Sequence, residues 1–134
     1  MKKLIVLSLS LIIFYGCSTN EGVNEPGPAV QKESATDPKL LTTGAVVVDF
    51  YADWCIPCKQ FKPEFDAVQQ KLSDKVTFLR INIDHDRANA EKFSIISIPT
   101  VAILKDGEEI DRIIGAVPAK ELESKVRAAF NLKK

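Results

Sequence analysis

The residues most suited to chemistry are two cysteines in the run Trp54-Cys55-Ile56-Pro57-Cys58-Lys59. A pair with this spacing is typical of a redox-active dithiol or of half a zinc site, and it also occurs without any function. A structural zinc site needs four ligands. Outside the pair, the sequence has one histidine, His85, and one further cysteine, the distant Cys17. We therefore expect dithiol–disulfide chemistry, with no metal and no cofactor.

The elements around the pair are those that make a thiol reactive. A β-branched run over residues 45–51 predicts a strand buried on both faces. Apolar residues at helical spacing then predict a helix from the cysteine motif to about Leu72. Cys55 would begin this helix, where the dipole and free backbone N–H groups favour the thiolate that attacks a disulfide. Cys58, one turn further on, is placed to release the bound substrate.

Three neighbouring side chains have predicted roles. Asp49 is an acid within an apolar strand, so burial would raise its pKa and suit it to exchange protons with Cys58; a solvent-facing strand end is the alternative. Trp54 would shield the disulfide and offer an apolar contact surface, although packing in the core would also explain it. Pro57 stiffens the first helical turn, where its missing N–H costs nothing.

The remaining pattern alternates strands and helices. Its first half is a βαβ unit, which implies parallel strands, and its second half ends in an antiparallel hairpin. We therefore expect an α/β domain with a mixed central sheet and helices on both faces. The further elements expected are a strand at 76–83, a helix at 87–94, a hairpin of 100–104 and 109–114, and a helix opening at Pro118 or Ala119.

These residues together resemble the thioredoxin family. The matching motifs are Val48 to Lys59, Pro63, Asn82-Ile83-Asp84, Ile98-Pro99-Thr100, Lys105-Asp106-Gly107 and Gly115-Ala116. The resemblance spans roughly residues 36 to 132. It implies the thioredoxin fold, here with the N-terminal strand shortened or absent, and thiol–disulfide oxidoreductase activity on protein disulfides.

The resemblance also implies roles for single residues. Pro99 corresponds to the cis-proline of the family, packed against the motif, and the backbone of Ile98 would pair with an extended substrate like an added strand. With Trp54, Ile56 and Pro57 they would form the substrate-binding surface. Two departures are that Ile56 stands where thioredoxin has glycine, and that Arg80 occupies the place of a lysine near the buried acid.

The dipeptide between the cysteines bears on the direction of electron flow. Strong oxidants and isomerases of this superfamily often carry a histidine there, which stabilises the thiolate. Ile56-Pro57 offers no such donor, so we expect a reductant of protein disulfides. The resemblance implies that it receives electrons from a membrane protein. The alternatives are an oxidant or isomerase, a dedicated donor to one acceptor in cytochrome c maturation or to a peroxidase, and a non-catalytic binding module.

The N-terminal residues predict export. Lys2 and Lys3 precede an apolar run from Leu4 to Tyr15, which matches a secretory signal and is short of the roughly 20 residues of a membrane-spanning helix. The run ends in Gly16-Cys17, which resembles the lipobox of bacterial lipoproteins, although Phe14 and Tyr15 depart from it. A plain cleaved signal and a short uncleaved anchor are the alternatives.

The expected organisation follows from these features. Residues 1–16 form a signal peptide, residues 17–35 a lipidated Cys17 with a polar Gly- and Pro-containing tether, and residues 36–134 the folded domain. The domain would face the extracytoplasmic side of a bacterial membrane, towards the periplasm or at the cell surface. The formal net charge is +0, and the sequence has no basic stripe, so nucleic acid is not an expected partner.

Overall fold

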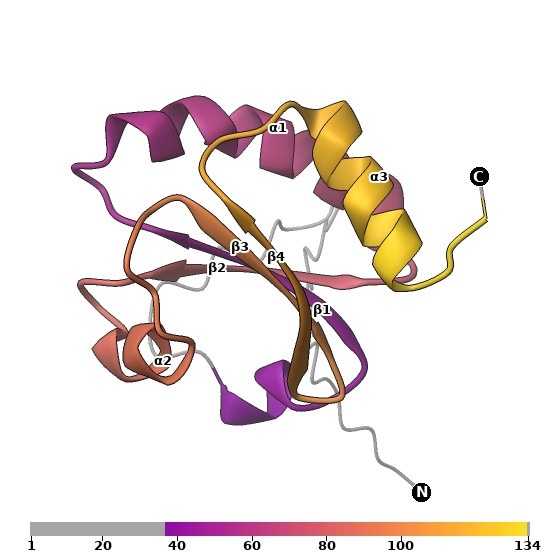
Figure 1. The fold of residues 1–134 in the computed structure, drawn as a ribbon, viewed down its shortest axis with the longest axis horizontal. Coiled ribbons are helices and arrows are strands. Elements are labelled where there is room, and N and C mark those ends of the chain that lie inside the picture. The colour runs from indigo at the N-terminus through magenta and orange to yellow at the C-terminus, as the bar shows by residue number, and fades with distance from the viewer. Residues whose placement is uncertain (1–36, 134) are drawn as a thin grey trace, which may run out of the picture. The chain divides into compact units, whose positions relative to one another are not determined.

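The structure is a computed structural model that describes residues 37–133. The predicted signal peptide, Cys17 and the tether lie outside these residues. Figure 1 shows the arrangement of the elements. Their order is η1 (Pro38–Leu41), β1 (Ala45–Tyr51), α1 (Ile56–Leu72), β2 (Thr77–Asn82), α2 (Arg87–Lys92), β3 (Thr100–Lys105), β4 (Glu108–Ile114) and α3 (Ala119–Ala129).

The strands form one mixed sheet in the order β2-β1-β3-β4. β1 runs parallel to β2 and antiparallel to β3, and β3 pairs antiparallel with β4. This confirms the mixed sheet and the hairpin predicted from the sequence. Within residues 37–133 no strand precedes β1, so β2 is one edge of the described sheet.

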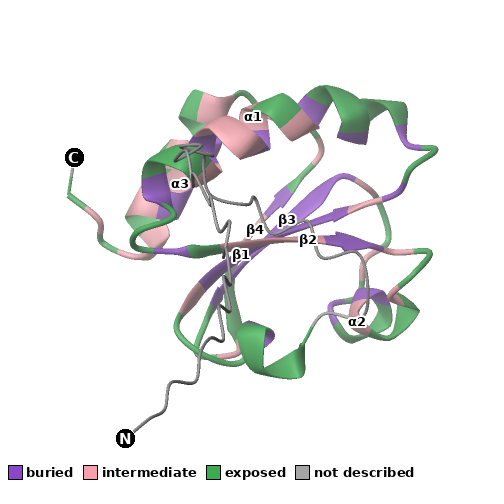
Figure 2. Ribbon diagram, turned by 180° about the vertical axis from the view of Figure 1, so that it is seen from behind, coloured by how far each residue is buried: buried purple, intermediate pink, exposed green. Residues whose placement is uncertain are grey.

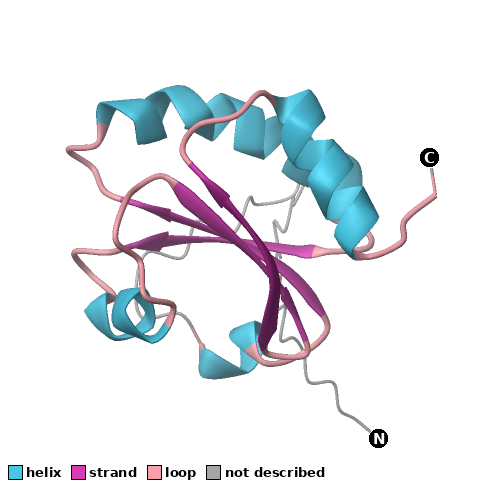
Figure 3. Ribbon diagram, viewed as in Figure 1, coloured by secondary structure: helices cyan, strands magenta, loops and turns pink. Residues whose placement is uncertain are grey.

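Helices cover both faces of this sheet, as expected (Figures 1 and 3). α1 and α3 contact each other and lie over one face, whereas η1 and α2 lie over the other. β1 is covered on both faces because it is a central strand, and its five middle residues are buried. Figure 2 shows this burial along the central strands, with exposed residues on the outer surfaces of the helices.

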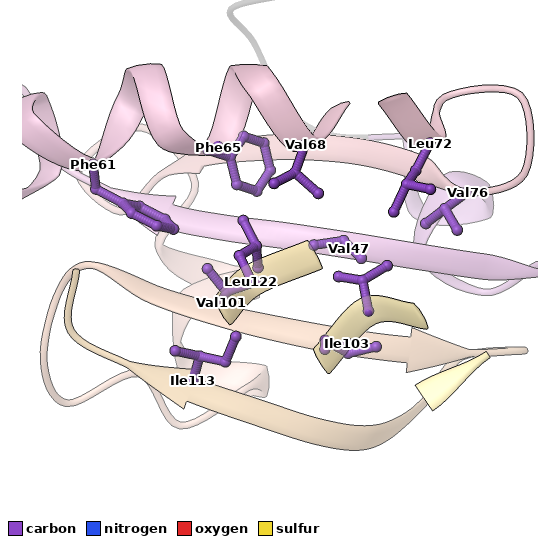
Figure 4. Packing of buried hydrophobic residues seen from close by; sticks show 11 residues of the cluster. Val47, Phe61, Phe65, Val68, Leu72, Val76, Val101, Ile103, Ile113 and Leu122 are labelled. Atoms are coloured by element: carbon purple, nitrogen blue, oxygen red, sulfur yellow. The ribbon is translucent and has the colours of Figure 1, made fainter. Parts of the chain in front are cut away.

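The core between the sheet and α1 is made of the residues that gave α1 its apolar face in the sequence. Phe61, Phe65, Val68 and Leu72 point from α1 towards the strands (Figure 4). Val47 of β1 meets them from the sheet. Since all five side chains are at most 1% exposed, the position of α1 on the sheet, and hence of its first turn, is fixed by packing.

The element boundaries agree with the predictions to within a few residues. The largest difference is the short helix predicted over 87–94, which ends at Lys92. Phe93 caps it, and Ser94 has a φ of 50°, a left-handed conformation that stops a helix. The polypeptide therefore leaves α2 early and enters the loop of residues 94–99, which leads to the predicted substrate-binding proline.

Candidate functional site

The two cysteines lie at the N-terminal end of α1, which follows β1 after a short loop. Cys55 is the N-cap of α1, and its Sγ accepts a hydrogen bond of 3.2 Å from the backbone N–H of Cys58. The two sulfurs form a disulfide. In the reduced protein, the same N–H group and the positive end of the helix dipole would face a Cys55 thiolate, and both favour the charged sulfur.

The environment of the pair distinguishes its two members. Cys55 is 4% exposed and Cys58 1%, so Cys55 is the more accessible to a second protein. The pair packs against Ala52, and Ile83 and Ile98 lie partly buried beside it. The greater exposure of Cys55 supports it as the attacking sulfur and Cys58 as the enclosed one.

A second segment completes the site from across the sheet. The peptide bond between Ile98 and Pro99 is cis, as the resemblance implies, and the carbonyl oxygen of Ile98 lies 3.9 Å from Cys55 Sγ. The loop is tied down on both sides: Thr100 Oγ1 donates to the Ser97 carbonyl at 2.8 Å, and the Gly115 N–H donates to the Pro99 carbonyl at 2.8 Å. The backbone of Ile98 is thereby held beside the disulfide.

Asp49 is fully buried in β1, with a relative exposure of 0%, which rules out the solvent-facing alternative. It shares a sheet face with Val47, two residues earlier, and therefore lies on the side covered by α1. Its Oδ2 is paired, whereas its Oδ1 has no hydrogen-bond partner within residues 37–133. Burial raises the pKa of this carboxyl to about 6, and the charge and hydrogen bond of Arg80 partly oppose the rise.

Arg80 is the partner of Asp49, as the resemblance suggested for this position. The two residues are paired across β1 and β2, and Arg80 Nε donates to Asp49 Oδ2 at 2.8 Å. The guanidinium carbon also lies 4.1 Å from the centre of the Tyr51 ring. A cation over an aromatic face is attracted to it, so Tyr51 holds the guanidinium in place beside the acid.

We predict that Arg80→Gln raises the pKa of Asp49 above about 6, because the arginine charge and hydrogen bond both lower it. The carboxyl carbon shift of Asp49, followed by NMR across a pH titration, measures this directly. Arg112→Gln is the matched control, since Arg112 pairs with Glu109 on β4 and should leave Asp49 unchanged. An unchanged or lower Asp49 pKa in Arg80→Gln would contradict the assigned pairing.

Trp54 stands at the surface and is 67% exposed, so core packing does not explain it. Its Nε1 donates to Asp84 Oδ2 at 2.9 Å. The buried Asn82 connects the residues on either side of this contact. Its Nδ2 donates to Asp53 Oδ2 at 3.0 Å, and its Oδ1 accepts a hydrogen bond from the Asp84 N–H at 2.9 Å. Sequence reasoning noted Asn82 and Asp84 within a motif but assigned them no role.

The other predicted site residues lie at the surface around the disulfide. Ile56 is 66% exposed, and Pro57 in the first turn of α1 is exposed too. Their side chains offer no hydrogen-bond donor, and the Cys58 N–H is the only hydrogen-bond donor to Cys55 Sγ found in residues 37–133. His85 is an exposed residue of the turn after β2.

Two features are absent from residues 37–133. No cluster of three or more histidine, cysteine, aspartate or glutamate side chains could hold a metal ion there. No helix of the described part has the length and apolar character to span a bilayer.

Comparison with known proteins gives a consistent result. The family model "Thioredoxin" matches residues 29–128. The thioredoxin of Synechocystis sp. is 39% identical over 97 residues, covering 72% of this chain and 91% of that protein. The thioredoxin of Bacillus subtilis is 37% identical over 83 residues, covering 62% and 80%. A solved thioredoxin from Malassezia sympodialis superposes with a TM-score of 0.63 at 34% identity, over 68% of this chain and 81% of that one.

The family match, the mixed sheet and the disulfide at the start of α1 agree with one another. The chain belongs to the thioredoxin family and is a protein-disulfide oxidoreductase whose active site is the Cys55–Cys58 pair.

Proposed function

We propose that this oxidoreductase works as a reductant of protein disulfides outside the cytoplasm, tethered to a membrane through Cys17. We infer the direction of electron flow from the environment of Cys55. The Cys58 N–H is its one hydrogen-bond donor within residues 37–133, and Ile56 and Pro57 add none. A thiolate with little extra stabilisation makes the dithiol a better electron donor.

The proposed reaction proceeds in two exchanges. The Cys55 thiolate attacks one sulfur of the substrate disulfide, so that bond breaks and a mixed disulfide forms. The other substrate cysteine leaves as a thiolate and takes up a proton. Cys58 then loses its proton and attacks Cys55 Sγ, which forms the Cys55–Cys58 disulfide and releases the second substrate thiolate. Two electrons pass to the substrate in total.

Asp49 is suited to take the proton from Cys58. With a pKa of about 6, the carboxylate is largely ionised near neutral pH and yet holds a proton more readily than an exposed aspartate. It lies on the sheet face beneath α1, the helix that carries Cys58, and its Oδ1 is unpaired within residues 37–133. We propose that this oxygen receives the proton, directly or through water, and later passes it to solvent.

The N-terminal residues support the proposed location. Lys2, Lys3, the apolar run and Gly16-Cys17 form the pattern of a lipoprotein signal. Several acyl chains on Cys17 would hold the protein stably, since a single chain binds a membrane only marginally. A coil over residues 18–35 would reach roughly 25 Å. In an oxidising compartment, the disulfide would be reduced again by a membrane electron donor.

Mass spectrometry and membrane fractionation of the full chain expressed in a bacterium test the location. We expect a mature chain that begins at an acylated Cys17 and sediments with membranes, and we expect Cys17→Ala to lose both properties. Cys58→Ala, the same substitution in the active site, should leave both intact. An unmodified chain that retains Met1 and stays in the soluble fraction would contradict the proposed anchor.

A further inference from the structure

An irregularity in β4 brings two charged side chains to one face of the sheet. Two consecutive residues of β3 have Asp111 and Glu109 as their partners, so Ile110 is an extra residue with no partner on β3. Residues three apart in a regular strand point to opposite faces of the sheet. The β-bulge at Ile110 instead puts Glu109 and Arg112 on the same face, and bulges beside active sites often redirect a side chain in this way.

The face that these two residues share is the one that α2 covers (Figure 1). The partner of Arg112 on β3 is Ala102, which is buried in the same cluster as Phe93, the residue that caps α2. Arg112 binds both carboxylate oxygens of Glu109, with Nε 2.6 Å from Oε1 and Nη2 2.7 Å from Oε2. A two-point pair of this kind fixes the direction of the planar guanidinium.

The oriented guanidinium holds the end of α2. Nη2 of Arg112 also donates to the Phe93 carbonyl oxygen at 2.6 Å, and carbonyl groups at a helix C-terminus lack a partner within the helix. Phe93 is 7% exposed, and its ring centre lies 5.6 Å from that of Phe50 in β1. The polypeptide at Phe93 is therefore attached to β1 by packing and to β4 by a hydrogen bond.

β4 also holds the far end of the loop that follows α2. The Gly115 N–H, directly after β4, donates to the Pro99 carbonyl at 2.8 Å. The segment between Phe93 and Pro99 is short, and fixing both of its ends leaves it few conformations. Ile98 belongs to this segment, and its carbonyl oxygen lies 3.9 Å from Cys55 Sγ. The position of that oxygen therefore depends on both attachments to β4.

The Ile98 carbonyl affects the two protonation states of a reduced Cys55 differently. Its oxygen accepts a hydrogen bond from the neutral S–H group, whereas its partial negative charge repels the thiolate. Both effects favour the neutral form of the sulfur. A loop that keeps this carbonyl beside Cys55 therefore holds the pKa of the thiol higher than a loop that is free to move away.

We propose that Arg112 is a positioning residue for thiol–disulfide exchange, which holds the end of α2 and so keeps the Ile98 carbonyl against Cys55, where it makes the thiolate less stable. Arg112 acts through the loop, because its side chain binds Glu109 and the Phe93 carbonyl. A dithiol with a less stable thiolate is a better electron donor. The inference thus deepens the proposed reductase function and rests on it for the direction of electron flow.

Other ionisable groups lie on the elements around Cys55. They are Asp49 on β1, Asp53 before α1, Cys58 and Lys59 in α1, and Asp84, His85 and Asp86 after β2. None of them is a partner in the hydrogen bonds of the Arg112 side chain within residues 37–133, and Asp49 lies on the opposite face of the sheet. Loss of the Arg112 charge would by itself raise the thiol pKa, since a nearby positive charge favours a thiolate. The effect through the loop has the opposite sign.

The test is the pH dependence of the rate at which iodoacetamide alkylates Cys55 in the reduced full chain, with the modified residue located by peptide mass spectrometry. The midpoint of this profile is the pKa of the thiol, because the thiolate is the reactive form. We expect Arg112→Met, which keeps the aliphatic part of the side chain, to lower this pKa by about half a unit or more. This corresponds to a rise of about threefold in the ionisation constant.

Arg127→Met is the matched control. Arg127 Nε donates to Glu123 at 2.8 Å and its Nη1 donates to the Lys133 carbonyl at 2.9 Å, so it makes the same kinds of contact at the C-terminal end of α3. Its loss should leave the Cys55 thiol pKa unchanged. If Arg112→Met does not fold, Arg112→Gln, which keeps a polar end, replaces it and should lower the pKa as well.

Two results would overturn the proposal. One is a thiol pKa that is unchanged or raised in the folded Arg112 variant, since Arg112 would then act on stability alone or only through its charge. The other is an equal shift in the Arg112 and Arg127 variants. The measurement needs no substrate disulfide, so either result would leave the reductase function standing, and the reduction potential of the parent chain tests that function separately.

Discussion

Replacing Cys55 by serine is expected to abolish disulfide reduction, with a loss on the order of 10⁴-fold or more, as when the nucleophile is removed from other covalent enzymes. Cys55 is the more accessible cysteine of the pair, and its Sγ accepts a hydrogen bond from the Cys58 N–H. A serine hydroxyl remains protonated at neutral pH and cannot form the mixed disulfide. The measurement is single-turnover reduction of a peptide disulfide by the reduced full chain.

Cys58→Ser should behave differently from Cys55→Ser. The difference between the two variants shows which cysteine attacks the substrate and which one releases it. Cys55 would still attack, but nothing would release the substrate, so one equivalent of mixed disulfide should accumulate and be visible by mass under non-reducing conditions. Cys17→Ala is the control, because the third cysteine should affect neither step. If Cys55→Ser trapped the substrate and Cys58→Ser did not, the two cysteines would have the opposite roles.

Replacing Asp49 by asparagine is expected to stabilise the folded chain at alkaline pH. The pKa of Asp49 is about 6 in the folded protein against an ordinary value of 3.8. Below pH 3.8 the acid is neutral in both the folded and the unfolded state. As the pH rises through the folded pKa, the buried group must ionise and stability is lost. Each pKa unit corresponds to about 1.4 kcal/mol, so the cost reaches about 3 kcal/mol above pH 6.

Urea unfolding of the oxidised parent and of Asp49→Asn at pH 4 and pH 8 measures this cost. We expect the variant to gain about 2 kcal/mol relative to the parent between the two pH values, because part of the cost is already present at pH 4. Asp74→Asn, at a carboxylate whose side chain is 67% exposed, should show no comparable change. A variant that is less stable than the parent at pH 8 and equally stable at pH 4 would show that the Arg80 pair outweighs the burial of the acid.

The same substitution should slow the chemistry that the acid serves. Without a base for Cys58, release of the substrate from the mixed disulfide should be slower by on the order of 10²-fold at pH 7. The difference should shrink above pH 9, where a thiol ionises without help because its ordinary pKa is about 8.5. Stopped-flow kinetics of the release step test this. A rate ratio that does not change with pH would mean that Asp49 acts only through structure.

The sequence was sufficient for the architecture because the patterns that encode it are local. The run at 45–51 predicted β1 with both of its bounds, and the spacing of Phe61, Phe65, Val68 and Leu72 predicted α1 and the face it buries. The burial of Asp49 was the favoured interpretation of an acid inside an apolar strand, and the structure confirms it against the solvent-facing alternative. Its pairing with Arg80 was suggested by the resemblance and is confirmed by the structure.

What the sequence did not reveal depends on contacts between distant residues. Tyr51 beneath the Arg80 guanidinium, and Asn82 between Asp53 and Asp84, are set by the register of β1 against β2. The exposure of Ile96 was hidden for a different reason. It lies in an apolar stretch with Ile95 and Ile98, which are partly buried, and the composition of the stretch does not tell which of the three side chains is exposed.

The reduction potential of the Cys55–Cys58 couple tests the central claim most directly. The full chain would be equilibrated against mixtures of reduced and oxidised glutathione, and the fraction of disulfide measured after acid quenching. A reductant that depends on a membrane electron donor should have a potential near that of thioredoxin, about −270 mV. A value nearer −120 mV, which marks a strong oxidant, would contradict the account and the role given to Ile56 and Pro57.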